Sequence, residues 1–253
     1  MLRVVTLNTW KCEGDYRARL PRMADGLHAL DADLLCLQEV FACAAPAADT
    51  AAWLAEALGM HAVATPARHG PRPFEGGPVP SSSGLAMLAR TALPEPERIP
   101  LPSDARDGER IAQAVRLETA RGPLRVANLH LTHLRDGAAL RQRQLEHLLT
   151  RAEDPTGALP LVLAGDFNAT PGAPELAPLR AHPAGDWGPE DPDRVLGTVP
   201  LGMPGRPPRP VDHVVLLHGA PALRIRRRRR VLDAADGAGG YASDHAGVLV
   251  EIG

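Results

Sequence analysis

Short hydrophobic runs recur along the chain and predict strands. Runs rich in Val, Leu and Ile that are bounded by Gly, Pro or Asn are typical of buried or half-buried strands. We expect about ten strands in all. The clearest cover residues 2–8, 33–38, 85–88, 111–117, 124–131, 161–164, 211–217, 223–232 and 246–252.

Between these runs, hydrophobic residues recur at helical spacing. Leucine or methionine stands at positions 20, 23, 27 and 30, which predicts an amphipathic helix packed on a sheet. Further helices are expected over residues 50–58 and 138–151, with a short one over 175–180. The chain opens strand–helix–strand and closes on antiparallel strands. This order predicts an α/β (α+β) fold with two packed mixed β-sheets flanked by helices. No repeat or change in composition divides the chain, so residues 1–253 are expected to form one domain.

Two stretches without clear periodicity predict long loops. Residues 66–83 are rich in Pro, Gly and Ser, and residues 165–210 are loop-rich apart from the short helix. Long loops in compact domains are often functional. We expect residues 66–83 and 186–209 to flank the mouth of a site, with Phe74 and Trp187 either packed there or in contact with a ligand.

Composition narrows the class of protein. The chain has 28 basic and 30 acidic residues, a net charge of −2 and a pI near 6.6, which excludes a surface that is basic throughout. The arginine run at residues 226–230 could bind nucleic acid, but alternate side chains of a strand face opposite sides, so a solvated edge strand is favoured. Three cysteines without metal-site spacing, no apolar run of membrane length and no leader pattern indicate a cytoplasmic protein, which we expect to be a monomer.

Polar residues stand where several predicted strands end. A carboxylate at the end of a buried strand loses hydration and needs a cation or hydrogen-bond donors as partners. The set has oxygen and imidazole donors and no thiolates, which favours Mg²⁺, with Mn²⁺ as the other candidate. A zinc protease and a serine hydrolase fit poorly, because neither an H-E-x-x-H nor a G-x-S-x-G motif occurs. The residues are Asn8, Glu39, His130, Asp166, Asn168, Asp212, Asp244 and His245.

Seven segments carry a resemblance to a known family. They are TLNTW (6–10), LQEV (37–40), GLAMLAR (84–90), ANLHL (127–131), LAGDFNA (163–169), VDHVV (211–215) and SDHAGV (243–248). In order and spacing they resemble the signature blocks of the endonuclease/exonuclease/phosphatase superfamily. The resemblance implies a four-layer α/β/β/α sandwich and Mg²⁺-dependent hydrolysis of phosphoesters.

The resemblance also implies a role for each residue of the set. Glu39 would be the main metal ligand, with Asn8 and Asp244 completing or supporting the metal site. Asp166 would orient or deprotonate the attacking water, and Asn168 would hold that water or a phosphate oxygen. His245 would contact the scissile phosphate and pair with Asp212. His130 would be a second phosphate contact, and Arg110 is a candidate substrate residue.

The substrate stays open between several phosphoesters. A phosphodiester is favoured, whether in nucleic acid, in a lipid headgroup as in sphingomyelinases, or in a small phosphate ester. A phosphomonoesterase acting on inositol or sugar phosphates is the alternative, and its extra basic residues could be Arg68, Arg72, Arg206 and Arg209. Leu85 replaces an Asn that many family members carry, which leaves the substrate class open. An inactive binding protein is disfavoured because every expected site position is filled. His133, His213 and His218 are expected to be structural.

Overall fold

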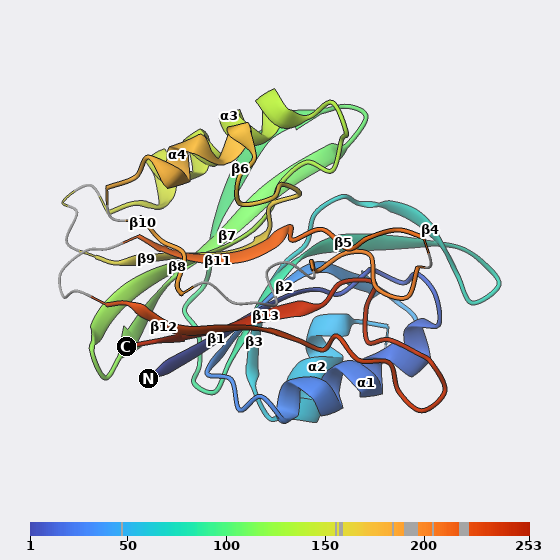
Figure 1. Ribbon diagram of the computed structural model, residues 1–253. Helices are drawn as coiled ribbons and strands as arrows, with labels where there is room; N and C mark the ends of the chain where they lie inside the picture. Colours follow the sequence, from blue (N-terminus) through green and yellow to red (C-terminus); the bar gives the residue numbers. More distant parts are fainter. Residues whose placement is uncertain are drawn as a thin grey trace.

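Two β-sheets pack face to face and carry helices on their outer faces (Figure 1). The computed structural model describes residues 1–46, 48–154, 156, 159–183, 185–189, 197–203, 205–217 and 223–253. Side chains of both sheets meet in a central hydrophobic layer, and each sheet shares a further apolar cluster with its helices. The four-layer α+β sandwich expected from the sequence is therefore confirmed.

The first sheet has the order β12-β13-β1-β2-β5-β3, with β4 paired to β5. Its β1 and β2 run parallel and its other neighbours run antiparallel. The parallel pair is the strand–helix–strand unit predicted at the start of the chain. The strands are β1 (Leu2–Asn8), β2 (Leu34–Cys43), β3 (His61–Thr65), β4 (Gly70–Phe74), β5 (Gly77–Ala89), β12 (Ile225–Val231) and β13 (Gly247–Ile252).

The second sheet has the order β10-β11-β9-β8-β7-β6, and its β8 and β9 run parallel. The crossover between β8 and β9 contains α3, which covers this sheet from outside (Figure 1). The strands are β6 (Glu97–Asp104), β7 (Gly108–Thr119), β8 (Gly122–His130), β9 (Leu161–Asp166), β10 (Gly185–Asp186) and β11 (Asp212–Leu217).

The helices begin and end where local chemistry favours it. Asp15 and Asp49 cap α1 and α2 by accepting hydrogen bonds from backbone N–H groups of the first turn, and Gly59 ends α2 in the left-handed conformation. None of the described helices combines the length and apolar character needed to cross a membrane. The helices are α1 (Tyr16–His28), α2 (Thr50–Leu58), α3 (Ala138–Ala152), the 3₁₀ turn η1 (Pro174–Leu176) and α4 (Ala177–Arg180).

The loop predicted over residues 66–83 is wrong, because much of it forms the β4–β5 hairpin. Prolines face each other in its register, with Pro71 opposite Pro80 and Pro73 opposite Pro78. Glu75 and Gly76 both have positive φ, as a two-residue hairpin turn requires. Prolines at every second position leave the intervening N–H groups free to pair, so the sequence suits an edge hairpin.

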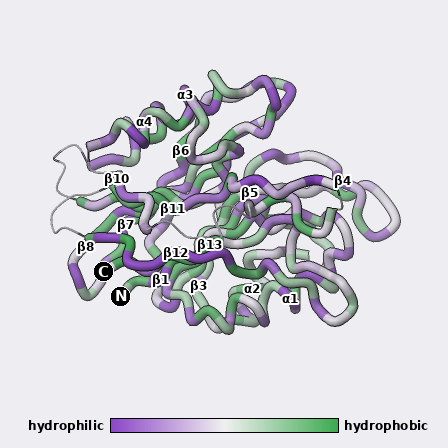
Figure 2. The backbone as a smooth tube through the Cα atoms, in the orientation of Figure 1, coloured by the Kyte–Doolittle hydropathy of each residue, from purple (hydrophilic) through white to green (hydrophobic). Residues whose placement is uncertain are grey.

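Three other regions differ from the prediction in whole or in part. The edge strands β3 and β6 were not predicted, because their outer side chains are exposed and the strands lack continuous hydrophobic runs. Phe74 does not lie at a site mouth but packs edge-on against Tyr16 in the apolar cluster under α1. The arginine run forms β12 at the sheet edge, as expected, and is the hydrophilic strand of Figure 2. Arg228, however, is buried and donates to the carbonyl of Trp187.

A buried polar bridge joins the two sheets below the end of the sandwich where β1 and β8 terminate. Gln38 on β2 donates from Nε2 to Oδ1 of Asn128 on β8 at 2.8 Å. Asn128 in turn donates to the carbonyls of Leu37 and Ala86, in the first sheet, at 2.9 and 3.0 Å. Directional bonds of this kind fix the register of one sheet against the other more tightly than apolar packing alone.

Candidate active site

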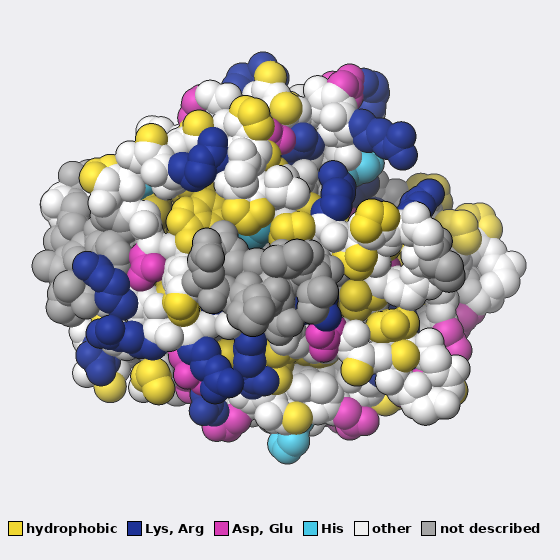
Figure 3. Space-filling model, viewed as in Figure 1, with side chains coloured by type: hydrophobic (Ala, Val, Ile, Leu, Met, Phe, Trp, Pro, Cys, Tyr) yellow, Lys and Arg dark blue, Asp and Glu magenta, His cyan; other side chains and the backbone are white. Residues whose placement is uncertain are grey.

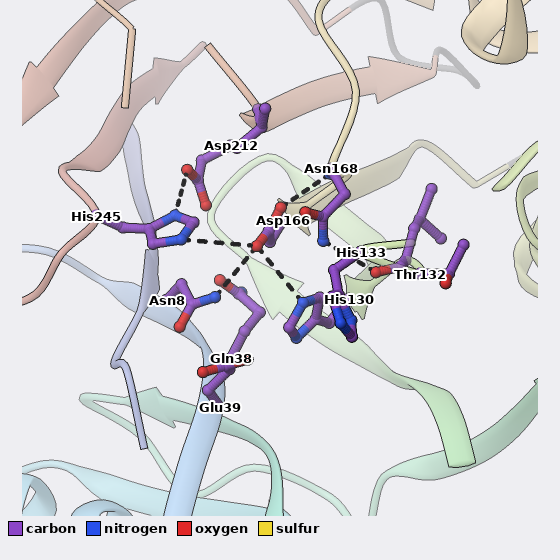
Figure 4. Close-up of polar contacts among 12 residues, drawn as sticks. Asn8, Gln38, Glu39, His130, Thr132, His133, Asp166, Asn168, Asp212 and His245 are labelled. Carbon is purple, nitrogen blue, oxygen red and sulfur yellow. Dashed lines mark hydrogen bonds and ion pairs between the residues drawn. The ribbon is translucent and has the colours of Figure 1, made fainter. Parts of the chain in front are cut away.

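The inward-facing rows of several strands change from apolar to polar at one end of the sandwich. On β9, Val162 and Ala164 face the other sheet and Asp166 continues their row. Asn8 and His130 end the corresponding rows of β1 and β8, and Asp212 begins that of β11. The carboxyl ends of parallel strands and the amino ends of their antiparallel neighbours therefore bring these side chains together (Figure 4).

Asp166 is the centre of this group. Its Oδ2 accepts a hydrogen bond from Nδ2 of Asn8 at 3.1 Å. The same oxygen lies 3.5 Å from Nε2 of His130 and 4.0 Å from Nε2 of His245 (Figure 4). All of these side chains are at least nine-tenths buried. The carboxylate thus has one oxygen aimed at the point where the two histidines converge.

His245 is held by Asp212. Its Nδ1 donates to Oδ2 of Asp212 at 2.9 Å, so Nε2 is left to face Asp166. Asp212 and Asp166 are also register partners on β11 and β9. Within the described part of the chain, Oδ1 of Asp212 is buried without a hydrogen-bond partner. The pairing of Asp212 with His245 is the one implied by the sequence resemblance.

The segment that carries His245 is tied to β1. Ser243 donates from Oγ to the carbonyl of Asn8 at 2.7 Å, and the backbone N–H of His245 donates to the same Oγ at 3.2 Å. Ser243 is thereby a structural link. It fixes the imidazole of His245 beside the end of β1, where Asn8 reaches Asp166.

Asn168 is fixed by a sharp change in the backbone after β9. Its φ is 50°, in the left-handed region that asparagine tolerates better than most residues. Its backbone N–H donates to Oδ1 of Asp166 at 2.8 Å, and its Nδ2 donates to the carbonyl of Leu131 at 3.0 Å. Gly165 permits the close approach of β8, because a Cβ there would lie 2.0 Å from the carbonyl oxygen of Leu129. In the GDFN segment, Gly165 therefore allows close packing against β8, and the backbone N–H of Asn168 fixes the carboxylate of Asp166.

Burial and neighbouring charges set the protonation states. Burial, together with the negative charge of Asp212, raises the pKa of Asp166 to about 7, although His245 and two hydrogen bonds act in the opposite direction. Burial alone would lower the pKa of His245, but the charge and hydrogen bond of Asp212 and the charges of Asp166 and Asp244 raise it to about 10. Burial and the nearby cations Arg110, Arg68, Lys11 and His245 lower the pKa of His130 well below its usual value. His245 is therefore an imidazolium at neutral pH and His130 a neutral imidazole.

A β-bulge in β2 places the side chain of Glu39 in the site. Simple alternation along β2 would place Gln38 and Glu39 on opposite faces, but the register shifts between Gln38 and Val40. Glu39 has a φ of 54°, and its Oε2 lies 3.2 Å from Nζ of Lys11, the only lysine in the chain. The bulge brings the carboxylate to the same end of the sandwich as Asp166.

The donor set around Glu39 fits a hard divalent cation. Burial raises the pKa of Asp244, and the charges of Glu39 and Asp212 raise it further against the opposing charge of His245. Among the described residues, the cations in contact with the carboxylates of the site are Lys11 and His245. They are fewer than the carboxylates. Carboxylate and amide oxygens with an excess of negative charge are the ligands that Mg²⁺ and Mn²⁺ prefer.

A second group of potential ligands consists of Asp166, Asp212 and His245, whose ligand atoms lie within 4.8 Å of one another. His245 is a poor metal ligand in this arrangement. Its Nδ1 is hydrogen-bonded to Asp212, and its raised pKa keeps the ring protonated, whereas metal binding needs neutral imidazole. The oxygens of Glu39, Asp244 and Asn8 are therefore the better donor set.

Arg110 is buried in an ion pair, which limits the substrate role expected for it. Its Nε and Nη2 both donate to the carboxylate of Asp107, at 2.8 and 2.5 Å. His133 lies against the same pair, with Nδ1 2.7 Å from Oδ1 of Asp107. His133 is thus locally bonded, as expected. His213 is also buried and lies 2.9 Å from the carbonyl of Ala169, while His218 lies outside the described residues.

The segment 186–209, expected at the site mouth, lies in part beside the site, because the N–H of Leu201 donates to the carbonyl of Asp244 at 2.7 Å. Its tryptophan packs elsewhere. Trp187 packs edge-on against His213, with ring centroids 5.5 Å apart, and belongs to the core beside α3. Arg206 and Arg209 are exposed on the loop before β11. Arg72 is held by the hairpin, since it donates to the carbonyl of Arg68 at 2.5 Å and to Oγ of Ser81 at 3.0 Å. Part of residues 186–209 lies outside the described ranges.

Arg19 is a positioning residue that the sequence did not reveal. It is buried on α1 and donates to the carbonyls of Thr9 and Ala242 at 2.8 and 3.2 Å. It also donates to the carbonyls of Trp10, Lys11 and Glu13 and so holds the loop that follows Asn8. An arginine in an amphipathic helix looks like a solvent-facing residue, so hydrophobic periodicity gives no signal for this role.

Comparisons with known proteins agree with this architecture. The model of the Endonuclease/Exonuclease/phosphatase family matches residues 5–245. A search of curated proteins found no match. Similar solved structures include an endonuclease/exonuclease/phosphatase from Beutenbergia cavernae, which is 25% identical with a TM-score of 0.73 over 99% of this chain and 71% of the other. D. rerio TDP2 complexed with single-strand DNA product is 17% identical with a TM-score of 0.76, over 100% of this chain and 98% of the other. The human Nocturnin catalytic domain with bound sulfate is 21% identical with a TM-score of 0.72, over 100% and 93%.

Proposed function

Since the chain belongs to the endonuclease/exonuclease/phosphatase family, we propose that it is a divalent-metal-dependent phosphodiesterase in which Asp166 activates the attacking water. The proposal is supported above all by one observation: a carboxylate and an imidazolium lie next to each other in the site. The carboxylate of Asp166 and the imidazolium of His245, itself held by Asp212, face each other across 4.0 Å. A water beside the carboxylate and a phosphate beside the imidazolium would meet in this space.

Each side chain has a distinct part in this reaction. Asp166 accepts the proton of the water, and a pKa near 7 suits a base that works near neutral pH. His245 donates a charge-assisted hydrogen bond to the phosphate oxygens as negative charge develops on them. The neutral His130 offers a second N–H to the phosphate, and the side-chain oxygen of Asn168 can accept a hydrogen bond from the water.

Glu39, Asp244 and Asn8 would hold the metal ion. When bound, a divalent ion supplies Lewis-acid stabilisation of the charge on the phosphate. Lys11, which lies 3.2 Å from Glu39, limits the charge repulsion among the carboxylates at this end of the sandwich. We expect Mg²⁺ to serve, with Mn²⁺ as a substitute.

A diester is favoured over a monoester by the state of the arginines. A terminal phosphate carries about two negative charges near neutral pH and calls for several free cations. Arg72 and Arg110 are engaged by Ser81 and Asp107, and Arg206 and Arg209 lie exposed on a loop. The alternative function, hydrolysis of inositol or sugar monophosphates, was expected to use Arg68, Arg72, Arg206 and Arg209; of these four only Arg68 lines the groove beside Glu39 and His130, so the alternative is correspondingly weaker.

A substrate panel tests the proposal. Wild-type protein is assayed with Mg²⁺, with Mn²⁺ and with EDTA on bis(4-nitrophenyl) phosphate, 4-nitrophenyl phosphate, single- and double-stranded DNA, RNA, sphingomyelin and inositol phosphates. We expect metal-dependent turnover of diesters and loss of activity in EDTA that is restored by excess Mg²⁺. Undiminished activity in EDTA, or a preference for the monoester 4-nitrophenyl phosphate over the diesters, would contradict the proposed function.

Replacement of Glu39 by Gln tests the assignment of the metal ligands. The substitution removes one negative oxygen donor while keeping the size of the side chain, so we expect the affinity for Mn²⁺ to fall about 10- to 100-fold. Isothermal titration calorimetry measures this without substrate. Glu118→Gln is the matched control, since Glu118 is exposed and pairs with Arg116 on β7. Equal Mn²⁺ affinity in both variants would move the metal site away from Glu39.

A further inference from the structure

A shallow groove continues from the site between the two sheets. Glu39 and His130 line its inner end, and Arg68 lines it together with Arg110 and Glu109. Arg68 lies in the segment between β3 and β4, and Arg110 lies at the start of β7. Figure 3 shows Lys and Arg side chains gathered beside a histidine at the upper right of the face, between the β6–β7 turn and the β4–β5 hairpin. The groove thus places Arg68 and Arg110 beside Glu39 and His130.

The backbone of Arg68 is held in a strained conformation. Its φ is 47°, a left-handed value that is unfavourable for a residue with a Cβ. Two contacts hold it there: its N–H donates to Oε2 of Glu109 at 3.3 Å, and its carbonyl accepts from Arg72 at 2.5 Å. Strain held by contacts on both sides of a residue is typical of positions that must present a side chain in one direction.

The strand β5 is shaped to accept this segment. Ser83 donates from its backbone N–H to the carbonyl of Ala67 at 3.0 Å. The next residue is Gly84, and a Cβ on it would lie 2.2 Å from the carbonyl oxygen of Thr65. Only glycine therefore allows the segment before Arg68 to lie against β5, which places the side chain of Arg68 along the groove.

Within the described residues, no acidic side chain forms an ion pair with the guanidinium of Arg68, whereas each acid near it is paired with another cation. Glu109 pairs with Arg98, Asp107 with Arg110, and Glu39 with Lys11. In the described ranges, no hydrogen bond or ion pair engages the guanidinium of Arg68, and Nη1 of Arg110 has no hydrogen-bond partner. Partial burial and the charge of Arg110 lower the pKa of Arg68, and the charges of Glu39 and Asp107 offset this only in part.

We propose that Arg68 is a specificity-determining residue that binds a second phosphate of the substrate, one that lies next to the scissile phosphodiester and occupies the groove beside Arg110. This rests on the proposed phosphodiesterase function and predicts a preference for substrates with at least two phosphates. A guanidinium donates two parallel hydrogen bonds to a phosphate, and a partly buried position strengthens them. The second phosphate is either the neighbouring diester of a polynucleotide or the terminal phosphate of a short one.

Four substrates distinguish these cases. Dithymidine phosphate has a single diester, its 5′-phosphorylated and 3′-phosphorylated forms add a terminal phosphate on either side, and trithymidine diphosphate adds a neighbouring diester. Each is assayed with Mg²⁺ on wild type, Arg68→Gln and Arg68→Lys. Arg116→Gln is the matched control, because Arg116 is an exposed arginine farther along β7.

We expect Arg68→Gln to lower kcat/KM about 10- to 100-fold for at least one substrate with a second phosphate and to change it less than about twofold for dithymidine phosphate. Arg68→Lys should retain part of the difference, since lysine supplies charge without the planar pair of donors. If only the turnover of trithymidine diphosphate falls, the second phosphate is the neighbouring diester of a polynucleotide. If only the turnover of a terminally phosphorylated dimer falls, it is the terminal phosphate of a short substrate. Equal losses on all four substrates, or none, would overturn the proposal.

A binding measurement separates this proposal from the proposed function. Thymidine 3′,5′-bisphosphate and thymidine 5′-phosphate are titrated into metal-free protein by calorimetry. Wild type should bind the bisphosphate more tightly, and Arg68→Gln should remove most of that difference. If no substrate is hydrolysed but the difference in binding is present, the catalytic assignment fails and the role of Arg68 stands. If hydrolysis occurs and wild type shows no preference for the bisphosphate, the role of Arg68 fails alone.

Discussion

Replacement of Asp166 by Asn is expected to lower kcat for a phosphodiester by about 10²- to 10⁴-fold. Asparagine has nearly the same shape and can keep one of the two hydrogen bonds that Asn8 and the backbone N–H of Asn168 donate to the carboxylate, but its amide cannot accept the proton of the attacking water. The loss should therefore fall on kcat, with KM little changed. Steady-state kinetics on bis(4-nitrophenyl) phosphate with saturating Mg²⁺ measures it.

Thermal unfolding provides the control for this variant. Burial raises the pKa of Asp166, so the folded environment disfavours the charged form; relief of that penalty in the neutral amide should offset the lost hydrogen bond and leave the Tm nearly unchanged. A stable variant without activity would support a catalytic role for the carboxylate. A variant that retains more than about a tenth of the wild-type kcat would remove Asp166 from the reaction, since that loss lies below the range for a general base.

Replacement of Asp212 by Asn is expected to reduce kcat/KM about 10²- to 10³-fold at pH 8 and to change the pH profile. Asp212 is the main reason that the pKa of His245 stands near 10 rather than below its ordinary value. Below pH 10 the wild-type imidazole is protonated, so the activity that depends on it persists through neutral pH and declines as pH rises through about 10. In the variant, burial acts without the compensating charge, the pKa of His245 falls, and the alkaline decline should move to a lower pH.

The measurements are kcat/KM from pH 5 to 10 and an NMR titration of the His245 ring. Activity of the variant should recover in part as pH is lowered toward 6, limited by protonation of Asp166, whose pKa no longer has the raising contribution of the Asp212 charge. Asp236→Asn serves as the control, since Asp236 is a surface acid paired with Arg22. An unchanged alkaline decline would show that Asp212 does not set the charge of His245.

The sequence was sufficient to predict most of the layers because the inner rows of the strands are continuous and apolar. Residues 161–164 and 211–217 could be recognised as buried strands without knowledge of their partners. The polar residues at their ends stood out for the same reason, since Asp166 and Asp212 follow or precede runs of buried side chains. Their presence at one end of the sandwich was predictable, whereas their catalytic roles remain predictions.

What the sequence could not supply was the set of contacts that depends on tertiary structure. Arg110 looked like a phosphate ligand, but Asp107, three residues before it, occupies two of its donors. Arg19 resembled a surface residue of a helix and instead binds five backbone carbonyls. Arg68 could be named as a basic residue of a loop, yet its position beside Glu39 and His130 depends on the hairpin that replaced the expected loop.

With the metal-binding role proposed for Glu39, the bulge predicts that selection for thermostability and selection for activity favour different residues at this position. A glycine would adopt the φ of 54° without the penalty of about 1–2 kcal/mol that a Cβ brings, and it would also remove a carboxylate from a crowded acidic region. A library screened for resistance to heat alone should therefore enrich Glu39→Gly, and the enriched clones should have lost their affinity for Mn²⁺. Directed evolution toward a more stable scaffold would have to hold this codon fixed or select for turnover at every round.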